Sequence, residues 1–230
     1  MRDNLPGFAA LDPREPVKLS LEARDFGIYA GFLLTWAYVA ILGRGRASGV
    51  PRASILITLV GFIAIMGFDG INAFFYDTSF FQLPLELPHL YTPRLDLRLS
   101  TGLLCGIAFG GIMLPVVNST LWRDPDPRPV FGGWWQFLGG LAVLGVFFLL
   151  NQTESGIFLY PFSILAAAST IILLALINVV FVISFFQRAP SAVTLRDTLN
   201  PFAAGVFLTL LELGLLSALR YAVLGTATLP

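Results

Sequence analysis

Long apolar runs separated by short polar segments dominate the chain. Six runs of roughly twenty residues lie at about 26–43, 53–69, 99–120, 132–150, 157–186 and 202–224. A helix of about 20 apolar residues matches the ~30 Å hydrocarbon core of a bilayer, and in lipid the backbone amides must be satisfied within the segment. No segment shows the alternating ten-residue pattern of a membrane β-barrel. The pattern predicts an all-α, polytopic integral membrane protein with about six transmembrane helices.

The same pattern predicts how the chain is divided. Residues 1–22 are polar and are expected to form an N-terminal tail, and residues 23–230 are expected to form a single six-helix transmembrane domain. The longest connection, at about 71–97, is rich in aromatic residues and contains Pro84, Pro88 and Pro93. Because aromatic rings favour the membrane–water boundary, we expect this connection to lie along the interface.

Composition excludes several classes of function. Only 12% of the residues are charged and the net charge is zero, so no basic surface suggests a nucleic-acid partner. Cys105 and His89 are the only cysteine and histidine. We therefore expect no covalent haem, no iron–sulfur cluster and no thiolate zinc site. Whether a lipid, quinone or pigment binds stays open.

The distribution of basic residues predicts the orientation in the membrane. Short loops rich in Lys and Arg stay in the cytoplasm, and the first, third and fifth loops carry Arg44, Arg46, Arg52, Arg123, Arg128, Arg188 and Arg196. The fourth loop has no basic residue. This distribution places both termini on the non-cytoplasmic side, although basic residues in the N-terminal tail favour the opposite arrangement.

A group of charges stands at the start of the first helix. Glu22 and Asp25 are three residues apart and share a helical face, with Tyr29 one turn further along. Asp69 at the predicted end of the second helix and Arg98 at the start of the third are expected at the same membrane face. We expect a cluster in which Arg24 or Arg98 neutralises these acids.

This cluster has two interpretations. Glu22 and Asp25 offer hard oxygen ligands for a divalent metal ion, to which Asp77 or Glu86 could add further ligands. Alternatively, Arg24, Asp69 and Arg98 form a structural charge cluster that fixes the register of the first three helices.

Glu212 is a second candidate, because it lies near the middle of the sixth run. A bare charge there would cost at least ~2.5 kcal/mol, and such residues commonly handle protons or ions. A neutral acid hydrogen-bonded to a neighbour is the alternative. Its candidate partners are Arg220, Asn178 or a group on another chain.

Gly102, Gly106 and Gly110 recur at four-residue spacing in the third run. Such a stripe of small residues lets a second helix approach closely, whether from the same chain or from a partner subunit.

The sequence contains no motif typical of catalysis: no phosphate-binding loop, no His-Glu-x-x-His, no nucleophile elbow and no second histidine. We therefore expect no enzymatic activity. The function that the sequence favours is an accessory or scaffolding subunit of a larger membrane protein complex, with other membrane subunits and lipids as partners. The alternative is a small transporter or an ion- or proton-handling protein using Glu212 and a cluster of Glu22, Asp25 and Asp69.

The stretch "LSLEARDFGIYAGF", residues 19–32, resembles the signature of a family of small polytopic prokaryotic membrane proteins known only as a domain of unknown function. That signature reads approximately Pro-Leu-Cys-Ala-Arg-Cys-x-Gly-Ile-Tyr-x-Gly. "FDG" at 68–70 and "RLSTGLLCG" at 98–106 are similar to its later elements. The resemblance covers roughly residues 19–111 and implies a location in the prokaryotic cytoplasmic membrane.

The chain departs from that family at the two cysteines, which are replaced here by Glu22 and Asp25. Nothing that depends on those cysteines carries over. The resemblance implies a shared charged core of Arg24, Tyr29, Asp69 and Arg98, and it brings no known activity.

Overall fold

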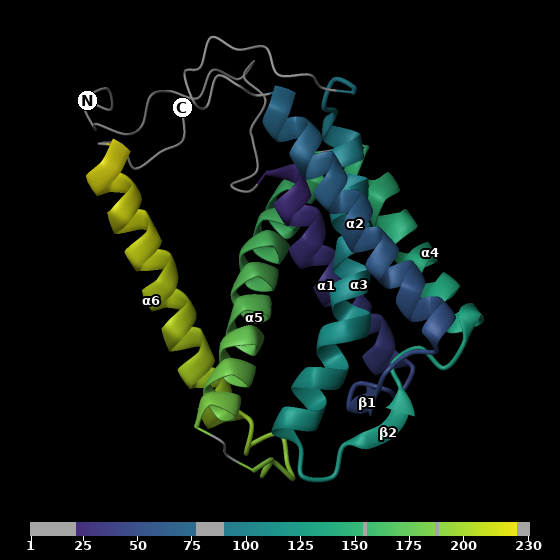
Figure 1. Ribbon diagram of the computed structural model, residues 1–230, viewed down its shortest axis with the longest axis vertical. Coiled ribbons are helices and arrows are strands. Elements are labelled where there is room, and N and C mark those ends of the chain that lie inside the picture. The colour runs from purple at the N-terminus through teal and green to yellow at the C-terminus, as the bar shows by residue number, and fades with distance from the viewer. Residues whose placement is uncertain (1–21, 77–89, 154–155, 187–188, 225–230) are drawn as a thin grey trace.

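Six long helices make up most of the computed structural model, which describes residues 22–76, 90–153, 156–186 and 189–224 (Figure 1). The helices are α1 (Ala23–Ile41), α2 (Ala53–Tyr76), α3 (Leu95–Leu121), α4 (Trp134–Asn151), α5 (Leu159–Phe185) and α6 (Leu199–Leu224). Two short strands, β1 (Ala47–Gly49) and β2 (Asp126–Pro129), and the 3-10 helix η2 (Gly156–Phe158) complete the described elements. The predicted all-α membrane class is confirmed.

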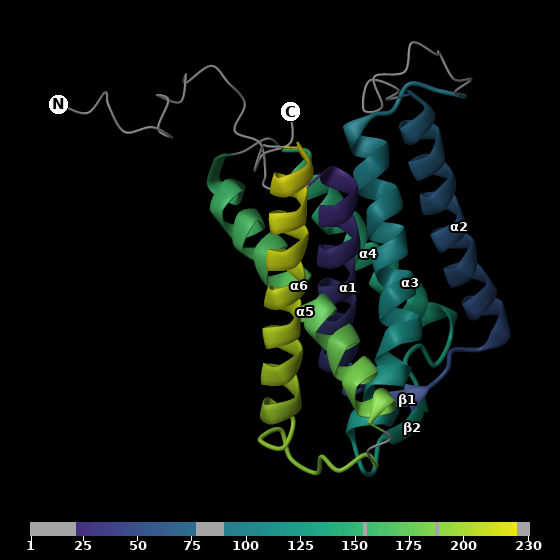
Figure 2. The same cartoon turned by 60° about the vertical axis from the view of Figure 1, so that its left-hand side comes forward.

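Five of these helices, α2 to α6, are long and apolar enough to cross a membrane. The 19-residue α1 is not among them, because Arg24 and Asp25 in its first turn lower its mean hydropathy. It nevertheless runs beside α3 inside the bundle, where the side chains of Phe26, Phe32 and Val39 are buried (Figure 2). A central position therefore compensates for the lower hydropathy of this helix.

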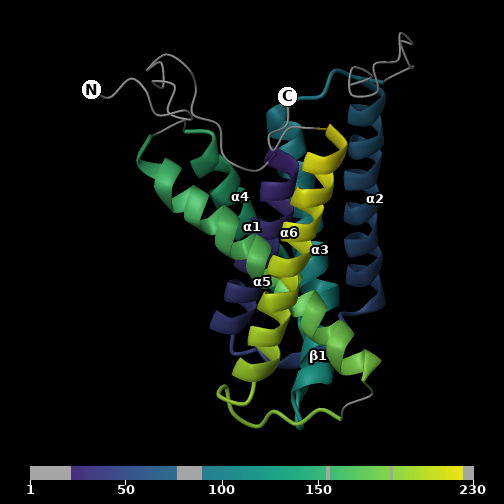
Figure 3. The ribbon, with the colours of Figure 1, turned by 90° about the vertical axis from the view of Figure 1, so that its left-hand side faces the viewer.

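The bundle is built around α3. Helices α1 and α2 pack on α3, α5 contacts both α1 and α3, and α6 packs against α5 (Figures 1 and 3). In its most apolar 18-residue window, 67% of α3 is buried inside the protein, whereas only 11% of the corresponding window of α6 is buried. Helix α6 also diverges from α5 along its length (Figure 1). It is thus the helix with the least cover from the rest of the chain.

The glycine stripe of α3 faces α1. A Cβ atom on Gly106 would lie 2.7 Å from the Cα atom of Gly31, and a Cβ atom on Gly31 would lie 3.0 Å from the carbonyl oxygen of Leu103. Gly102 lies against the backbone of Arg24, and Gly110 against the side chain of Thr35. Of the two uses that the sequence left open, the structure supports packing within the chain.

The loops at one end of the bundle form an ordered structure, which we call the loop platform (residues 42–52 and 122–133). Strand β1 pairs in parallel with β2. Arg44 donates a 2.6 Å hydrogen bond to the carbonyl oxygen of Pro129, and Arg128 donates one of 3.0 Å to that of Gly43. Gly43 has φ +69°, a left-handed conformation that suits glycine at the turn after α1.

The buried side chain of Asn118 attaches the loop platform to α3. Asn118 of α3 donates hydrogen bonds of 3.2 and 2.8 Å to the carbonyl oxygens of Gly45 and Ala47. The guanidinium of Arg46 lies 3.7 Å from the centre of the Trp122 ring, a cation–π contact. Trp122 also forms a β-bridge with Ala192, which connects the α5–α6 loop to the same end.

The structure corrects the expected boundary of the second helix. Helix α2 does not end at Asp69 but continues to Tyr76, because the Asp69 carboxylate is paired and buried inside the bundle. The predicted connection at 71–97 is therefore shorter at both ends, since residues 71–76 belong to α2 and residues 95–97 to α3. All of the predicted polar tail (residues 1–22) except Glu22, and the centre of this connection (residues 77–89, with His89), lie outside the described residues.

Candidate functional site

The carboxylate of Asp69 is the centre of a polar cluster between α1, α2 and α3. Its side chain is 2% exposed, and its Oδ2 atom accepts a 2.8 Å hydrogen bond from Nη2 of Arg24, which forms a buried ion pair. Tyr91 donates a 2.6 Å hydrogen bond to Oδ1, and Thr101 donates one of 3.3 Å to Oδ2. Because a buried charge is tolerated only when it is paired and hydrogen-bonded, these three donors explain how Asp69 lies inside the bundle.

Asn72, one turn after Asp69, holds the segment that leads into α3. Its Nδ2 atom donates a 2.9 Å hydrogen bond to the carbonyl oxygen of Tyr91, and its Oδ1 atom accepts one of 2.8 Å from the backbone of Leu90. Burial, together with the hydrogen bond to Asp69, raises the pKa of Tyr91 to about 12. Tyr91 therefore remains a neutral donor over the physiological pH range.

Glu22 and Arg98 form a second ion pair at the same end, with a distance of 2.7 Å between Oε1 and Nη1. The Glu22 side chain is 47% exposed, so this pair lies at the edge of the bundle. The structure thus pairs Arg24 with Asp69 and Arg98 with Glu22.

Asp25 is exposed and lies close enough to Glu22 for the two carboxylates to repel each other. Within the described part of the chain, no three His, Cys, Asp or Glu side chains are grouped so that they could hold a metal ion. The additional ligands suggested by the sequence, Asp77 and Glu86, fall in residues 77–89 and outside the described region. A metal site at Glu22 and Asp25 therefore stays a prediction, and it would have to compete with Arg98 for Glu22.

Glu212 lies in the middle of α6, where α6 begins to lose contact with α5. Asn178 of α5 donates a 2.9 Å hydrogen bond to Oε2 of Glu212 and one of 3.1 Å to the hydroxyl of Thr209. Asn178 and Thr209 are buried, whereas Glu212 is exposed. Of the partners considered from the sequence, the structure selects Asn178. No ion pair joins Glu212 to Arg220, both of which are described residues.

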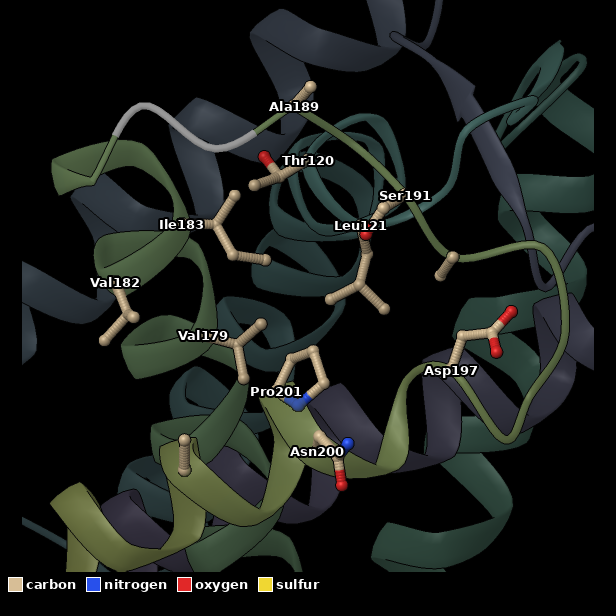
Figure 4. A pocket seen from close by; sticks show the side chains of 12 residues that line it. Thr120, Leu121, Val179, Val182, Ile183, Ala189, Ser191, Asp197, Asn200 and Pro201 are labelled. Atoms are coloured by element: carbon tan, nitrogen blue, oxygen red, sulfur yellow. The ribbon is translucent and has the colours of Figure 1, made fainter.

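A cavity of about 210 Å³ lies between the ends of α3, α5 and α6, next to the α5–α6 loop (Figure 4). The side chains of Leu121, Val179 and Ile183 face this space, and Asp197 and Asn200 stand at its edge. Oδ2 of Asp197 accepts hydrogen bonds of 2.9 and 2.7 Å from the backbone amides of residues 193 and 194. These bonds to the loop backbone lower the pKa of the Asp197 carboxyl.

Sequence reasoning missed several residues of these sites. Thr101 is not among the candidates singled out from the sequence, yet its hydroxyl is buried against Asp69. Asn72 and Tyr91 flank a stretch without periodicity, so nothing in the sequence links them to Asp69. The sequence does indicate an extended segment at β2, because prolines alternate at 125, 127 and 129 and favour an extended backbone.

Comparison with known proteins relates the first part of the chain to a family. Residues 15–112 match the family model described as "Predicted membrane protein (DUF2085)". The match includes α1, α2 and most of α3, which carry the cluster around Asp69, and it covers less than half of the 230 residues. No curated protein and no solved structure matches the chain. The first three helices of this multi-pass membrane protein are thus similar to a family of predicted membrane proteins whose function is unknown.

Proposed function

We propose that the protein is a non-enzymatic accessory or scaffolding subunit of a larger membrane complex and that α6 contacts the partner subunit. The observation that carries this proposal is the exposed carboxyl group of Glu212 in the middle of a helix that could span a membrane. Around it, α6 presents exposed apolar side chains such as Leu215, Leu216 and Leu219, each more than 60% exposed.

Lipid does not suit this face of α6 as well as it suits the other outer helices. A charge at the centre of a bilayer costs at least ~2.5 kcal/mol, and Asn178 supplies one hydrogen bond to a carboxyl group that can accept several. Helix α4 contains no charged residue, and the only charge in α2, Asp69, is buried. The hydrocarbon of the bilayer can therefore cover α2 and α4, whereas Glu212 favours a protein partner with a hydrogen-bond donor or a cation.

The proposed orientation follows from the arginines. Arg44, Arg46, Arg52, Arg123 and Arg128 belong to the loop platform. Since basic short loops remain in the cytoplasm, we place the loop platform on the cytoplasmic side of a prokaryotic inner membrane and both termini on the opposite side.

The test is whether association with a partner depends on Glu212. The protein would be extracted from its native membrane in mild detergent, and co-purifying chains would be identified by sizing and mass spectrometry. We expect one membrane protein at a fixed ratio, lost with Glu212→Leu and retained at least in part with Glu212→Gln, which preserves hydrogen bonding. Ile65→Ala on the exposed side of α2 is the matched control and should retain the partner.

A photo-crosslinker at position 216 should also react with that partner, and one at position 65 should not. Wild-type protein that is purely monomeric, or a partner that remains bound to the Glu212→Leu variant, would refute the proposal.

The hydrogen bonds from Asn178 to Glu212 and Thr209 favour a second candidate, an ion- or proton-handling role. Polar groups gathered inside a membrane often mark an ion pathway. This candidate predicts that Glu212→Gln abolishes proton- or ion-coupled uptake in reconstituted vesicles. Unchanged flux would reject it.

A further inference from the structure

The cavity between α3, α5 and α6 lies at one end of the spanning helices. Thr120 and Leu121 end α3, Ile183 is close to the end of α5, and Pro201 lies in the first turn of α6. The ends of helices that cross the ~30 Å hydrocarbon core lie where lipid headgroups begin. The cavity is therefore at the depth at which a phospholipid changes from apolar to polar.

The lining of the cavity also changes from apolar to polar in this direction. Leu121, Val179 and Ile183 form an apolar interior, and Ser191 and Asn200 add a hydroxyl and an amide at its edge (Figure 4). The volume of about 210 Å³ is smaller than the ~300–1,000 Å³ of pockets that enclose a drug-sized ligand. It suits a section of one acyl chain, with the rest of the lipid remaining in the bilayer.

Two exposed arginines belong to the segments that border the polar edge. The backbone amide of Arg123 donates a 3.0 Å hydrogen bond to the carbonyl oxygen of Ala192, which lines the cavity, and Arg196 directly precedes Asp197. Within the described residues, neither arginine forms an ion pair with a carboxylate.

Among the described residues that line the cavity, Asp197 is the only charged one. The carboxylate of Asp197 is bound by two amides of its own loop, although the charge of Arg123 still reaches it. Arg123 and Arg196 therefore retain guanidinium groups that can bind a phosphate through charge-assisted hydrogen bonds.

We propose that this cavity binds an anionic phospholipid, with the headgroup phosphate at Arg123 and Arg196 and one acyl chain against Val179 and Ile183. Basic pockets between membrane helices are a recurring form of lipid site. Binding here would join α6, the helix with least cover from the rest of the chain, to α3 and α5. The proposal is independent of Glu212, which lies two to three turns further along α6 than the cavity residues.

The test uses delipidated full-length protein in detergent and follows its thermal unfolding. We expect phosphatidylglycerol at saturation to raise the Tm by about 5 °C or more, and phosphatidylcholine to have a much smaller effect. Equal shifts from both lipids would overturn the role of the arginines. An equal shift from inorganic phosphate alone would overturn the lipid and leave a simple anion site.

Three variants locate the site. The Arg123→Gln/Arg196→Gln double variant should lose most of the shift caused by phosphatidylglycerol, and Ala204→Phe, which places a ring in the cavity, should reduce it. Arg52→Gln, an exposed arginine in the loop platform, is the matched control and should keep the full shift. A loss as large with Arg52→Gln would show diffuse attraction to the whole basic end and would refute the site.

Native mass spectrometry provides a measurement that does not depend on the stability of the variants. Wild-type protein should retain one phosphatidylglycerol molecule that the double arginine variant lacks. Equal retention by both proteins would overturn the proposal.

Discussion

Replacing Gly106 by Ala tests whether the contact of α3 with α1 determines the stability of the bundle. The new Cβ atom would lie 2.7 Å from the Cα atom of Gly31 and from the carbonyl oxygen of Ile28. Carbon atoms attract each other best at ~3.5–4.0 Å, so α1 has to move away by about 1 Å. Both obstacles are backbone atoms, and no change of side-chain rotamer can relieve the contact.

The expected cost follows from two opposing terms. Inserting a methyl group into a tightly packed contact costs about 1–3 kcal/mol, whereas exchanging glycine for alanine inside a helix recovers about 0.5–1 kcal/mol. We expect Gly106→Ala to lower the free energy of unfolding by about 0–2.5 kcal/mol, the difference between those two terms. The loss would be larger if the neighbouring contacts of Gly102 and Gly31 opened as well.

The assay is reversible unfolding in mixed micelles, followed by circular dichroism. Gly67→Ala in α2 is the matched control, since nothing lies within 4 Å of its Cβ position. That variant should be as stable as the wild type or more stable by up to ~1 kcal/mol. If Gly106→Ala were as stable as Gly67→Ala, the close approach of α1 and α3 would not contribute to stability as we argue.

Three further predictions concern the cluster around Asp69 and the neighbouring pair of Glu22 and Arg98. Arg24→Met or Asp69→Leu alone should each lower the free energy of unfolding by about 3–5 kcal/mol, because each leaves a buried charge without its partner. The double variant should be less destabilised than either single variant. If micelle unfolding showed strictly additive losses, the pairing would be contradicted. The pKa of Tyr91 is about 12 in the folded state, against an ordinary value of ~10. The free energy of unfolding should therefore fall as the pH rises from about 10 to 12. Tyr91→Phe should remove that fall, together with the phenolate absorbance that accompanies it. Glu22→Gln, which breaks the exposed pair with Arg98, should cost less than ~1 kcal/mol in the same unfolding assay.

The sequence predicted the helices well because hydrocarbon imposes one simple condition, a run of about 20 apolar residues. The ion pairs of Arg24 and Arg98 were also predictable, since the first three helices place charges at one membrane face and charges there have to be paired. The end of α2 was not predictable, because the charge of Asp69 would end the membrane helix only if it had no partner.

The sequence could not identify the remaining partners of Asp69, because those contacts join segments without a shared periodicity. Tyr91 reaches Asp69 across 22 residues and Thr101 reaches it across 32. Such distances along the chain are fixed only when the helices pack, and the hydrophobic pattern does not specify the rotation of each helix about its axis.

The parallel pairing of β1 with β2 has a consequence for how the protein is made. Ser48 and Asp126, which share a hydrogen bond, are 78 residues apart. Since α2 and α3 lie between the two strands, both helices must leave the ribosome before the pair can form. Strand β1 therefore remains unpaired during part of synthesis. A chain arrested before residue 126 would expose the edge of β1 to proteases and to neighbouring chains.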